Sequence, residues 1–169
     1  VMPTTHLGWY TDMAQGFKYF TFVTEELPRI CRQFFPQMSD QREDNLVAGL
    51  SMGGYGAWQL AMSLPELFAA VVPICGGGMY WNAGRLVDLP VWAFHGALDK
   101  TVLVEESVKM IEEINKKGGN AKLTIYPENS HDAWSDTYSN LEVFRWLLDQ
   151  KKKNRTEHAD EYIGAKKYG

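Results

Sequence analysis

The chain has 169 residues, of which 45% are hydrophobic and 13% aromatic, so it is long enough to fold as one domain around a sizeable core. Its net charge of -4 and its scattered acidic residues offer no basic surface for nucleic acid. No apolar run approaches the length of a membrane-spanning helix, so we expect a soluble protein, with the cytoplasm favoured over secretion as its compartment.

Apolar runs and turn residues predict strands that alternate with helices. In chain order we expect a strand at 1–3, a helix at 17–35 kinked at Pro28, a strand at 45–50, a helix at 53–63, strands at 67–75 and 90–95, a helix at 105–117, a strand at 122–126 and a helix at 141–148. This order is typical of an α/β fold with a mostly parallel sheet of about five strands and helices on both faces. Residues 1–152 form the expected domain, and 153–169 a charged tail.

The strand expected at 45–50 runs into a serine between glycines, in the pattern G-L-S-M-G at 49–53. A G-x-S-x-G sequence between a strand and a helix is typical of a sharp turn that exposes a nucleophilic serine. We therefore interpret Ser51 as a nucleophile, and the backbone N–H of Met52 at the helix start as an oxyanion donor. The alternative is a glycine-rich turn whose serine is incidental.

An activated serine needs a base and an acid that orients the base, and on this kind of sheet the chain order is serine, acid, histidine. Asp99 and His131 each follow a predicted strand, so both are expected on loops at the sheet edge where Ser51 lies. We interpret His131 as the base and Asp99 as the acid. The alternatives are a turn cap ahead of Thr101 for Asp99 and a solvated loop position for His131.

Other acidic and histidine side chains were weighed for the same roles. Asp132 is a rival for the acid, but a residue adjacent to His131 would normally point away from its ring. His95 precedes a glycine directly after a strand and could mark an oxyanion loop, although its place just before the loop of the acid favours a structural role. His6 and His158 lie in segments without a supporting pattern.

The remaining chemistry-bearing side chains give weaker signals. Cys31 and Cys75 form no C-x-x-C pair, and we interpret both as small core residues. Trp81 follows a run of glycines and Trp134 lies three residues after His131, so both are candidates for the wall of a substrate pocket, with ordinary packing as the alternative. No long insertion that would make a lid separates the strands. This favours an open site and short-chain or soluble substrates.

Two groups of segments resemble a known superfamily. The stretch V-A-G-L-S-M-G-G-Y-G-A, with P-E-L-F-A-A-V-V after it, resembles the α/β-hydrolases, specifically the esterase group of tributyrin esterases, S-formylglutathione hydrolases and feruloyl esterases. The segments L-P-V-W-A-F-H-G-A-L-D-K-T-V and Y-P-E-N-S-H-D-A-W look more like the phospholipase/carboxylesterase and prolyl-oligopeptidase-related branches. The resemblance covers residues 1–152 and implies a serine hydrolase whose triad is Ser51, Asp99 and His131.

The resemblance also implies strands ahead of V-M-P, including one whose loop supplies a second oxyanion N–H, and this chain shows none of them. Losing one such donor typically costs about 100- to 1000-fold in rate. Three explanations stand open. The strand at 1–3 lies beside 45–50 so that the loop of Thr4, Thr5 and His6 supplies the donor, a second copy of the chain covers the exposed sheet edge, or the chain is a fragment with little activity.

These observations predict a serine carboxylic ester hydrolase that acts on small-molecule esters through an acyl-enzyme, with no metal or organic cofactor. The same triad would also serve a thioesterase or a serine peptidase. A catalytically weak hydrolase-fold fragment or binding module is the alternative from a different class. We expect no nucleic-acid or membrane partner, and a homo-oligomer is one possible way to cover an open sheet edge.

Overall fold

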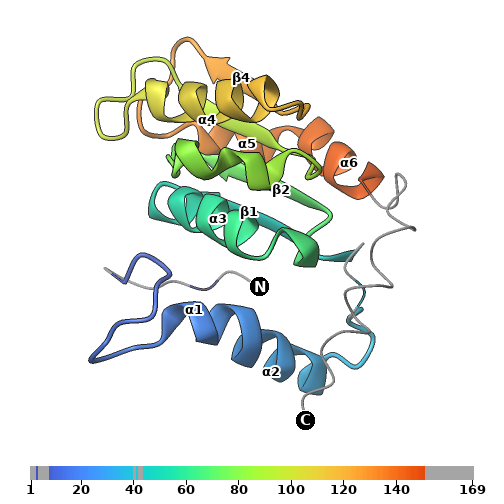
Figure 1. The fold of residues 1–169 in the computed structure, drawn as a ribbon. Coiled ribbons are helices and arrows are strands. Elements are labelled where there is room, and N and C mark those ends of the chain that lie inside the picture. The colour runs from blue at the N-terminus through green and yellow to red at the C-terminus, as the bar shows by residue number, and fades with distance from the viewer. Residues whose placement is uncertain (1–2, 4–7, 40, 42–43, 151–169) are drawn as a thin grey trace.

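A computed structural model describes residue 3 and residues 8–39, 41 and 44–150 of the chain. A four-stranded sheet forms the centre, and its strands are parallel and follow chain order (Figure 1). The strands are β1 (Leu46–Leu50), β2 (Ala70–Ile74), β3 (Trp92–Gly96) and β4 (Lys122–Tyr126). The α/β class and the parallel sheet are therefore confirmed. The strand expected at 1–3 is not among the four, because residues 1 and 2 lie outside the described residues and Pro3 has no strand conformation.

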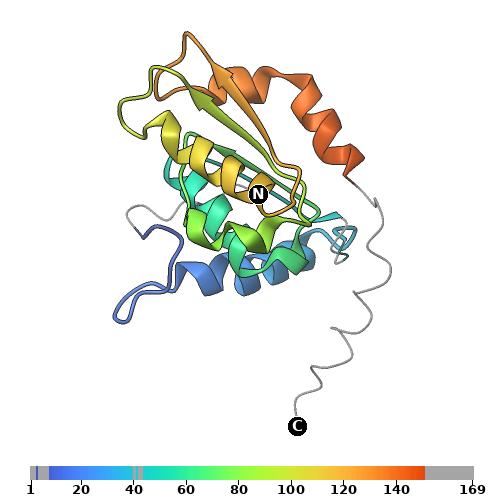
Figure 2. The ribbon, with the colours of Figure 1, turned by 45° about the horizontal axis from the view of Figure 1, so that its top comes forward.

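Alternating side chains of the strands face two separate hydrophobic clusters. One face packs against α3 (Met52–Ser63), the 3-10 helix η4 (Tyr80–Leu86) and α4 (Val104–Lys116), with Trp58, Val71 and Met110 in its core. The other face packs against α6 (Leu141–Asp149), which follows the short α5 (Trp134–Ser139). Figure 2 shows the sheet between these two layers. Helices on both faces explain why β2 is buried along its whole length.

Among the elements that differ from the sequence prediction, two do so for local reasons. The strand predicted at 67–75 begins only at Ala70, because Pro65 opens a 3-10 turn, η3 (Pro65–Leu67). The helix η4 was not expected, since its glycine and asparagine mask any apolar period.

The helix predicted at 17–35 is continuous from Tyr19 to Phe34, but it changes its winding near Pro28. It consists of α1 (Tyr19–Thr21), a π-helical stretch η1 (Phe22–Glu26) and α2 (Leu27–Phe34). Proline has no N–H to donate one turn back, and its ring crowds the carbonyl there, so the wider π turn just before it relieves that contact. The expected kink at Pro28 therefore takes the form of a π bulge.

This first helix lies beyond β1, beside α3, at the edge of the sheet (Figure 1). A cavity of about 730 Å³ separates it from β1 and α3. Within the described part of the chain, β1 pairs only with β2, so its other edge faces this cavity. The helices found there and elsewhere in the described residues are all too short or too polar to cross a membrane.

Candidate active site

Ser51 occupies a tight corner between β1 and α3. Its backbone has φ 52° and ψ −118°, a left-handed conformation that is unusual for a residue other than glycine. Its N–H donates to the carbonyl of Ile74 at 2.9 Å, which ties the corner to the end of β2. A Cβ on Gly49 would overlap the carbonyl group of Gly53, and a Cβ on Gly54 would lie 2.6 Å from the Ile74 oxygen. Glycine is thus required where the strand and helix backbones meet.

The structure brings Ser51, His131 and Asp99 together from three separate loops at the carboxyl end of the sheet. Ser51 Oγ lies 2.7 Å from His131 Nε2. His131 Nδ1 lies 2.6 Å from Asp99 Oδ2 on the other side of the ring. Because a carboxylate only accepts, His131 donates from Nδ1, and its Nε2 is left to accept the proton of the Ser51 hydroxyl. The geometry is that of a nucleophile, a base and an orienting acid.

Asp99 is held as an anion in a buried position. Its Oδ1 accepts from the backbone N–H groups of Thr101 and Val102, both at 2.9 Å, and its side chain is not exposed. Burial by itself acts to raise the pKa of Asp99. The hydrogen bonds from His131, Val102 and Thr101 and the charge of His131 outweigh that effect and hold the pKa below its usual value. The rival acid, Asp132, is exposed and lies close to Ser130 Oγ, at 3.5 Å.

Met52 and Trp134 each lie next to a member of the triad. Met52 is the first residue of α3 and directly follows Ser51, so its backbone N–H belongs to the positive end of a 12-residue helix. Trp134 begins α5, and its ring meets the His131 ring edge to face, with the centroids 5.3 Å apart.

Trp81 is not brought to the triad. Its carbonyl oxygen accepts from Lys117 Nζ at 3.2 Å, and Lys117 directly follows the last residue of α4. Asp99 lies ahead of the other end of that helix, which is roughly 20 Å long at 1.5 Å per residue. The Trp81 side chain is 67% exposed and packs on Tyr80. The expectation that Trp81 walls the substrate pocket is therefore corrected: the glycine run carries the chain away from the site along α4.

Behind the triad lie two buried groups whose proximity the sequence did not reveal. Cys75 directly follows β2 in a left-handed conformation, with φ 46°, and its side chain is fully buried. His95, also fully buried, lies near the end of β3, where it contacts Ser107 and the carbonyl of Val102. Cys75 ends a strand adjacent to β1, and that position was the available signal for its place near Ser51.

Cys75, His95 and Asp99 have side-chain atoms within 4.8 Å of one another, which makes them a possible metal-ligand set. Each of them is already engaged, however. Both ring nitrogens of His95 have partners, Asp99 accepts from two N–H groups and from His131, and the Cys75 sulfur accepts from the backbone of Gly96 and Ala133. A metal ion would have to displace these bonds, including the one that orients His131, so the donor set does not fit a metal.

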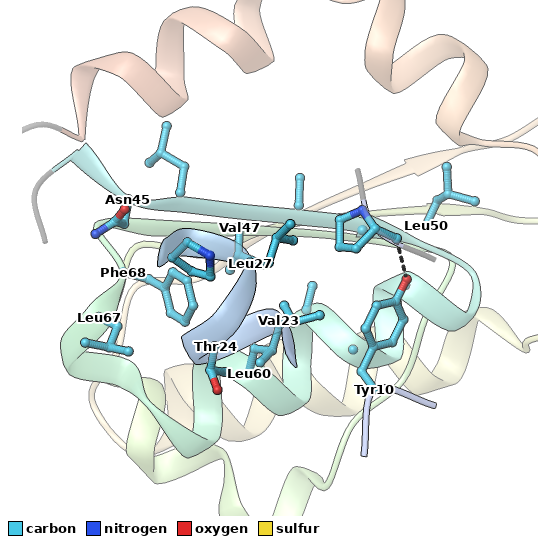
Figure 3. Close-up of a pocket in the computed structure, with 18 of the residues that line it drawn as sticks. Tyr10, Val23, Thr24, Leu27, Asn45, Val47, Leu50, Leu60, Leu67 and Phe68 are labelled. Atoms are coloured by element: carbon cyan, nitrogen blue, oxygen red, sulfur yellow. Dashed lines mark hydrogen bonds between the residues drawn. The ribbon is translucent and has the colours of Figure 1, made fainter. Parts of the chain in front are cut away.

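The cavity beside β1 reaches the site at one end. Ser51 and Met52 are among its lining residues, together with apolar side chains of α3 and the first helix. Figure 3 shows it extending from Asn45 and Leu67 to Leu50 and Tyr10, whose hydroxyl donates to the carbonyl of Pro3 at 3.3 Å. The loop of Thr4, Thr5 and His6, considered as a source of a second oxyanion donor, lies outside the described residues.

The parallel sheet, with a serine at a strained strand-to-helix corner, defines an α/β-hydrolase fold. Residues 10–122 match the family model described as putative esterase, and the chain belongs to that family. It is 36% identical over 113 residues to an S-formylglutathione hydrolase of Paracoccus denitrificans, covering 59% of this chain and 38% of that protein. It is also 31% identical over 74 residues to an acetyl esterase of Caldicellulosiruptor saccharolyticus, covering 43% of this chain and 27% of the relative.

Solved structures give the same picture of the fold. A thermostable esterase is 36% identical with a TM-score of 0.68, over 75% of this chain and 36% of that one. The fluorophosphonate-binding serine hydrolase FphF of Staphylococcus aureus has a TM-score of 0.73 at 21% identity, over 87% of this chain and 70% of that one. The chain thus spans 27–38% of the length of the two curated relatives, and 36% of the thermostable esterase.

Proposed function

We propose that this chain carries the catalytic site of a serine carboxylic ester hydrolase, with Ser51 as nucleophile, His131 as base and Asp99 as the acid that orients it. The observation that carries the proposal is the pair of short contacts on the two sides of one imidazole: 2.7 Å to Ser51 Oγ and 2.6 Å to Asp99 Oδ2. Family membership and the names of the relatives as esterases and hydrolases support the same reaction class.

Acylation begins when His131 Nε2 accepts the Ser51 proton as Ser51 Oγ attacks the ester carbonyl. Negative charge then develops on the carbonyl oxygen, and the backbone N–H of Met52 at the start of α3 is the proposed donor to it. His131 returns the proton to the departing alcohol, which leaves an acyl group on Ser51. Water attacks this acyl-enzyme by the same sequence, so the acid is released and Ser51 is restored.

We expect small-molecule esters as substrates, with short or soluble acyl groups. Trp134, whose ring lies against His131, is the proposed contact for the substrate beside the base. A thioester offers the same acyl carbon to the same nucleophile, and one relative is named for such a substrate, so thioester hydrolysis is the second candidate. Peptide cleavage with the same triad ranks behind both.

The proposal is tested by hydrolysis of p-nitrophenyl esters from acetate to decanoate by the wild type and by Ser51→Ala, alongside a formyl or acetyl thioester. We expect turnover that the substitution abolishes, with the chain-length optimum reporting the size of the acyl site. Asp132→Asn is the matched control and should keep wild-type activity. Equal rates for wild type and Ser51→Ala, together with no labelling of Ser51 by a fluorophosphonate, would leave a hydrolase fold without the reaction.

A further inference from the structure

Asp99 faces two histidine rings. Its Oδ2 atom is 2.6 Å from His131 Nδ1 and 3.4 Å from His95 Nε2. The two rings differ in their surroundings, because the His131 side chain is 21% exposed whereas that of His95 is wholly buried. The buried imidazole of His95, beside the triad acid, has no part in the proton transfers described above.

The contacts of His95 define which of its nitrogens carries a proton. Nε2 lies 2.9 Å from the carbonyl oxygen of Val102, and a carbonyl can only accept. Nε2 therefore bears a hydrogen that is donated to the Val102 carbonyl, and Asp99 Oδ2 lies 3.4 Å from the same nitrogen without a hydrogen bond to it. The same N–H thus binds the loop after Asp99 through Val102, whose own N–H donates to Asp99 Oδ1.

The opposite nitrogen is joined to α4. His95 Nδ1 lies 2.7 Å from Ser107 Oγ, which in turn lies 3.2 Å from the carbonyl of Gly76, next to Cys75. The Ser107 hydroxyl can donate either to Nδ1 or to the Gly76 carbonyl. It can therefore form a hydrogen bond with Nδ1 as donor or as acceptor. The ring is therefore held at both nitrogens between the ends of β2 and β3 and the start of α4.

We propose that His95 is a positioning residue of the active site: its Nε2–H holds the Val102 carbonyl, and with it the loop whose N–H groups bind Asp99, so that Oδ2 meets His131 Nδ1. This inference rests on the proposed function, since it assigns His95 a part in the same triad. The charged and titratable groups that face Asp99 and His95 are His131 from the loop after β4, Cys75 from the end of β2, and Tyr55 of α3 with its neighbour Glu106 of α4.

Two substitutions of His95 test the contacts of its two ring nitrogens separately. The amide nitrogen of His95→Gln can occupy the place of Nε2, and so can donate to Val102. The amide of His95→Asn reaches only the place of Nδ1, and so can contact Ser107 alone. His95→Asn therefore loses the donor to Val102 while keeping a polar group in the buried site, and Ile114→Val, in the buried core of α4, serves as a control for a general loss of packing.

For each variant we would measure kcat and KM for a p-nitrophenyl ester, the melting temperature, and the strongly deshielded NMR signal of the His131–Asp99 proton. His95→Asn should lower kcat about 10- to 100-fold with little change in KM, as a small misplacement of a triad member does. His95→Gln should stay within about threefold of the wild type and keep the NMR signal.

The outcomes separate this inference from the proposed function. If His95→Gln and His95→Asn lose kcat equally and in step with their melting temperatures, His95 has a merely structural role and the inference is overturned. Wild-type kinetics and NMR signal in both variants would overturn it as well. If the wild type hydrolyses no ester and Ser51 is not labelled, the proposed function fails. The NMR signal of the His131–Asp99 proton then still tests the role of His95, since it should be lost in His95→Asn and retained in His95→Gln.

Discussion

Ser51 holds its position because Gly49, where β1 and α3 approach each other, has no side chain. The Ser51 corner has a left-handed backbone, and the backbones of Gly49 and Gly53 meet beneath it. Strain of this kind persists only where the surroundings over-determine it. Here the surroundings are the hydrogen bond from Ser51 N–H to β2 and the close packing of α3 on the end of β1.

Gly49→Ala should therefore destabilise the fold, because its new Cβ would overlap backbone atoms that cannot move aside. We expect a loss of about 1–3 kcal/mol in the free energy of unfolding, measured with urea, and a loss of fluorophosphonate labelling. Gly53→Ala is the matched control, since its Cβ would meet only the Tyr10 hydroxyl at 3.5 Å. Equal stabilities for the two variants would show that the corner tolerates a side chain.

Asp99 makes the stability of the chain depend on pH. Its lowered pKa means that the folded chain binds this proton less readily than the unfolded chain does. Asp99 thus contributes stability above the usual aspartate pKa of about 4, and this contribution is lost as pH falls through the lower folded value. Urea unfolding at pH 7 and near pH 3 should show the difference between wild type and Asp99→Asn shrinking with acid. A difference that grows with acid would contradict the assignment.

Cys75 should be chemically inert in the folded chain. Burial is the main cause that raises the pKa of its thiol, to about 11, and the side chain is fully enclosed. Roughly one molecule in a thousand would carry the thiolate at pH 8, and the thiolate is the reactive form. Thiol-reagent assays should find Cys75 unreactive in native protein and reactive in urea, with Cys31 as the internal comparison. Rapid native modification of Cys75 would mean that the site opens.

At the scale of elements, α3 is the helix that connects the site to the core. It is buried on most of its surface because β1 and β2 lie on one side and Tyr10 approaches it on another. Trp58 lies in the middle of this helix and is wholly enclosed. Among the residues that the structure describes, its indole N–H has no hydrogen-bond acceptor.

Trp58→Phe should change the free energy of unfolding little. The substitution removes a buried N–H whose burial without an acceptor costs about 1–3 kcal/mol, and this gain offsets the lost apolar contacts. We expect a change within about 1 kcal/mol in the free energy of unfolding, against a loss of about 3–5 kcal/mol for Trp58→Ala. Urea denaturation followed by circular dichroism measures both. Equal losses for the two variants would show that the indole N–H does have a partner.

At the scale of the whole molecule, one edge of β1 has no strand partner among the residues that the structure describes. Backbone N–H and C=O groups along a strand edge favour pairing with another strand, and the cavity beside β1 leaves room for one. The prediction that a second copy covers this edge is tested by sedimentation across micromolar concentrations. Ala48→Asp, an exposed position in β1, should shift a dimer toward monomer. A wild-type monomer at every concentration would contradict the prediction.

Much of the fold was predictable because the elements are short, local and strongly patterned. Apolar runs bounded by glycine and proline gave the positions of β1 to β4 within a few residues, and alternation with helices gave the parallel sheet. The π turn before Pro28 and the 3-10 helix η4 were not predictable in the same way. The conformation of η4 depends on its contacts with α3 and α4, and the π turn relieves local crowding at Pro28, so neither follows from an apolar period.

By itself, the sequence determined which residues could serve as nucleophile, base and acid, because strand ends place their following loops at one edge of a parallel sheet. Only the tertiary structure decided the distances between Ser51, His131 and Asp99, and the position of Trp81 at the far end of α4. It also brought the side chains of Cys75 and His95 together beside Asp99, although their places at strand ends already indicated the sheet edge at which they lie. The reason is physical: a strand end gives the edge at which a residue lies, whereas the direction of its side chain depends on the packing of other elements around it.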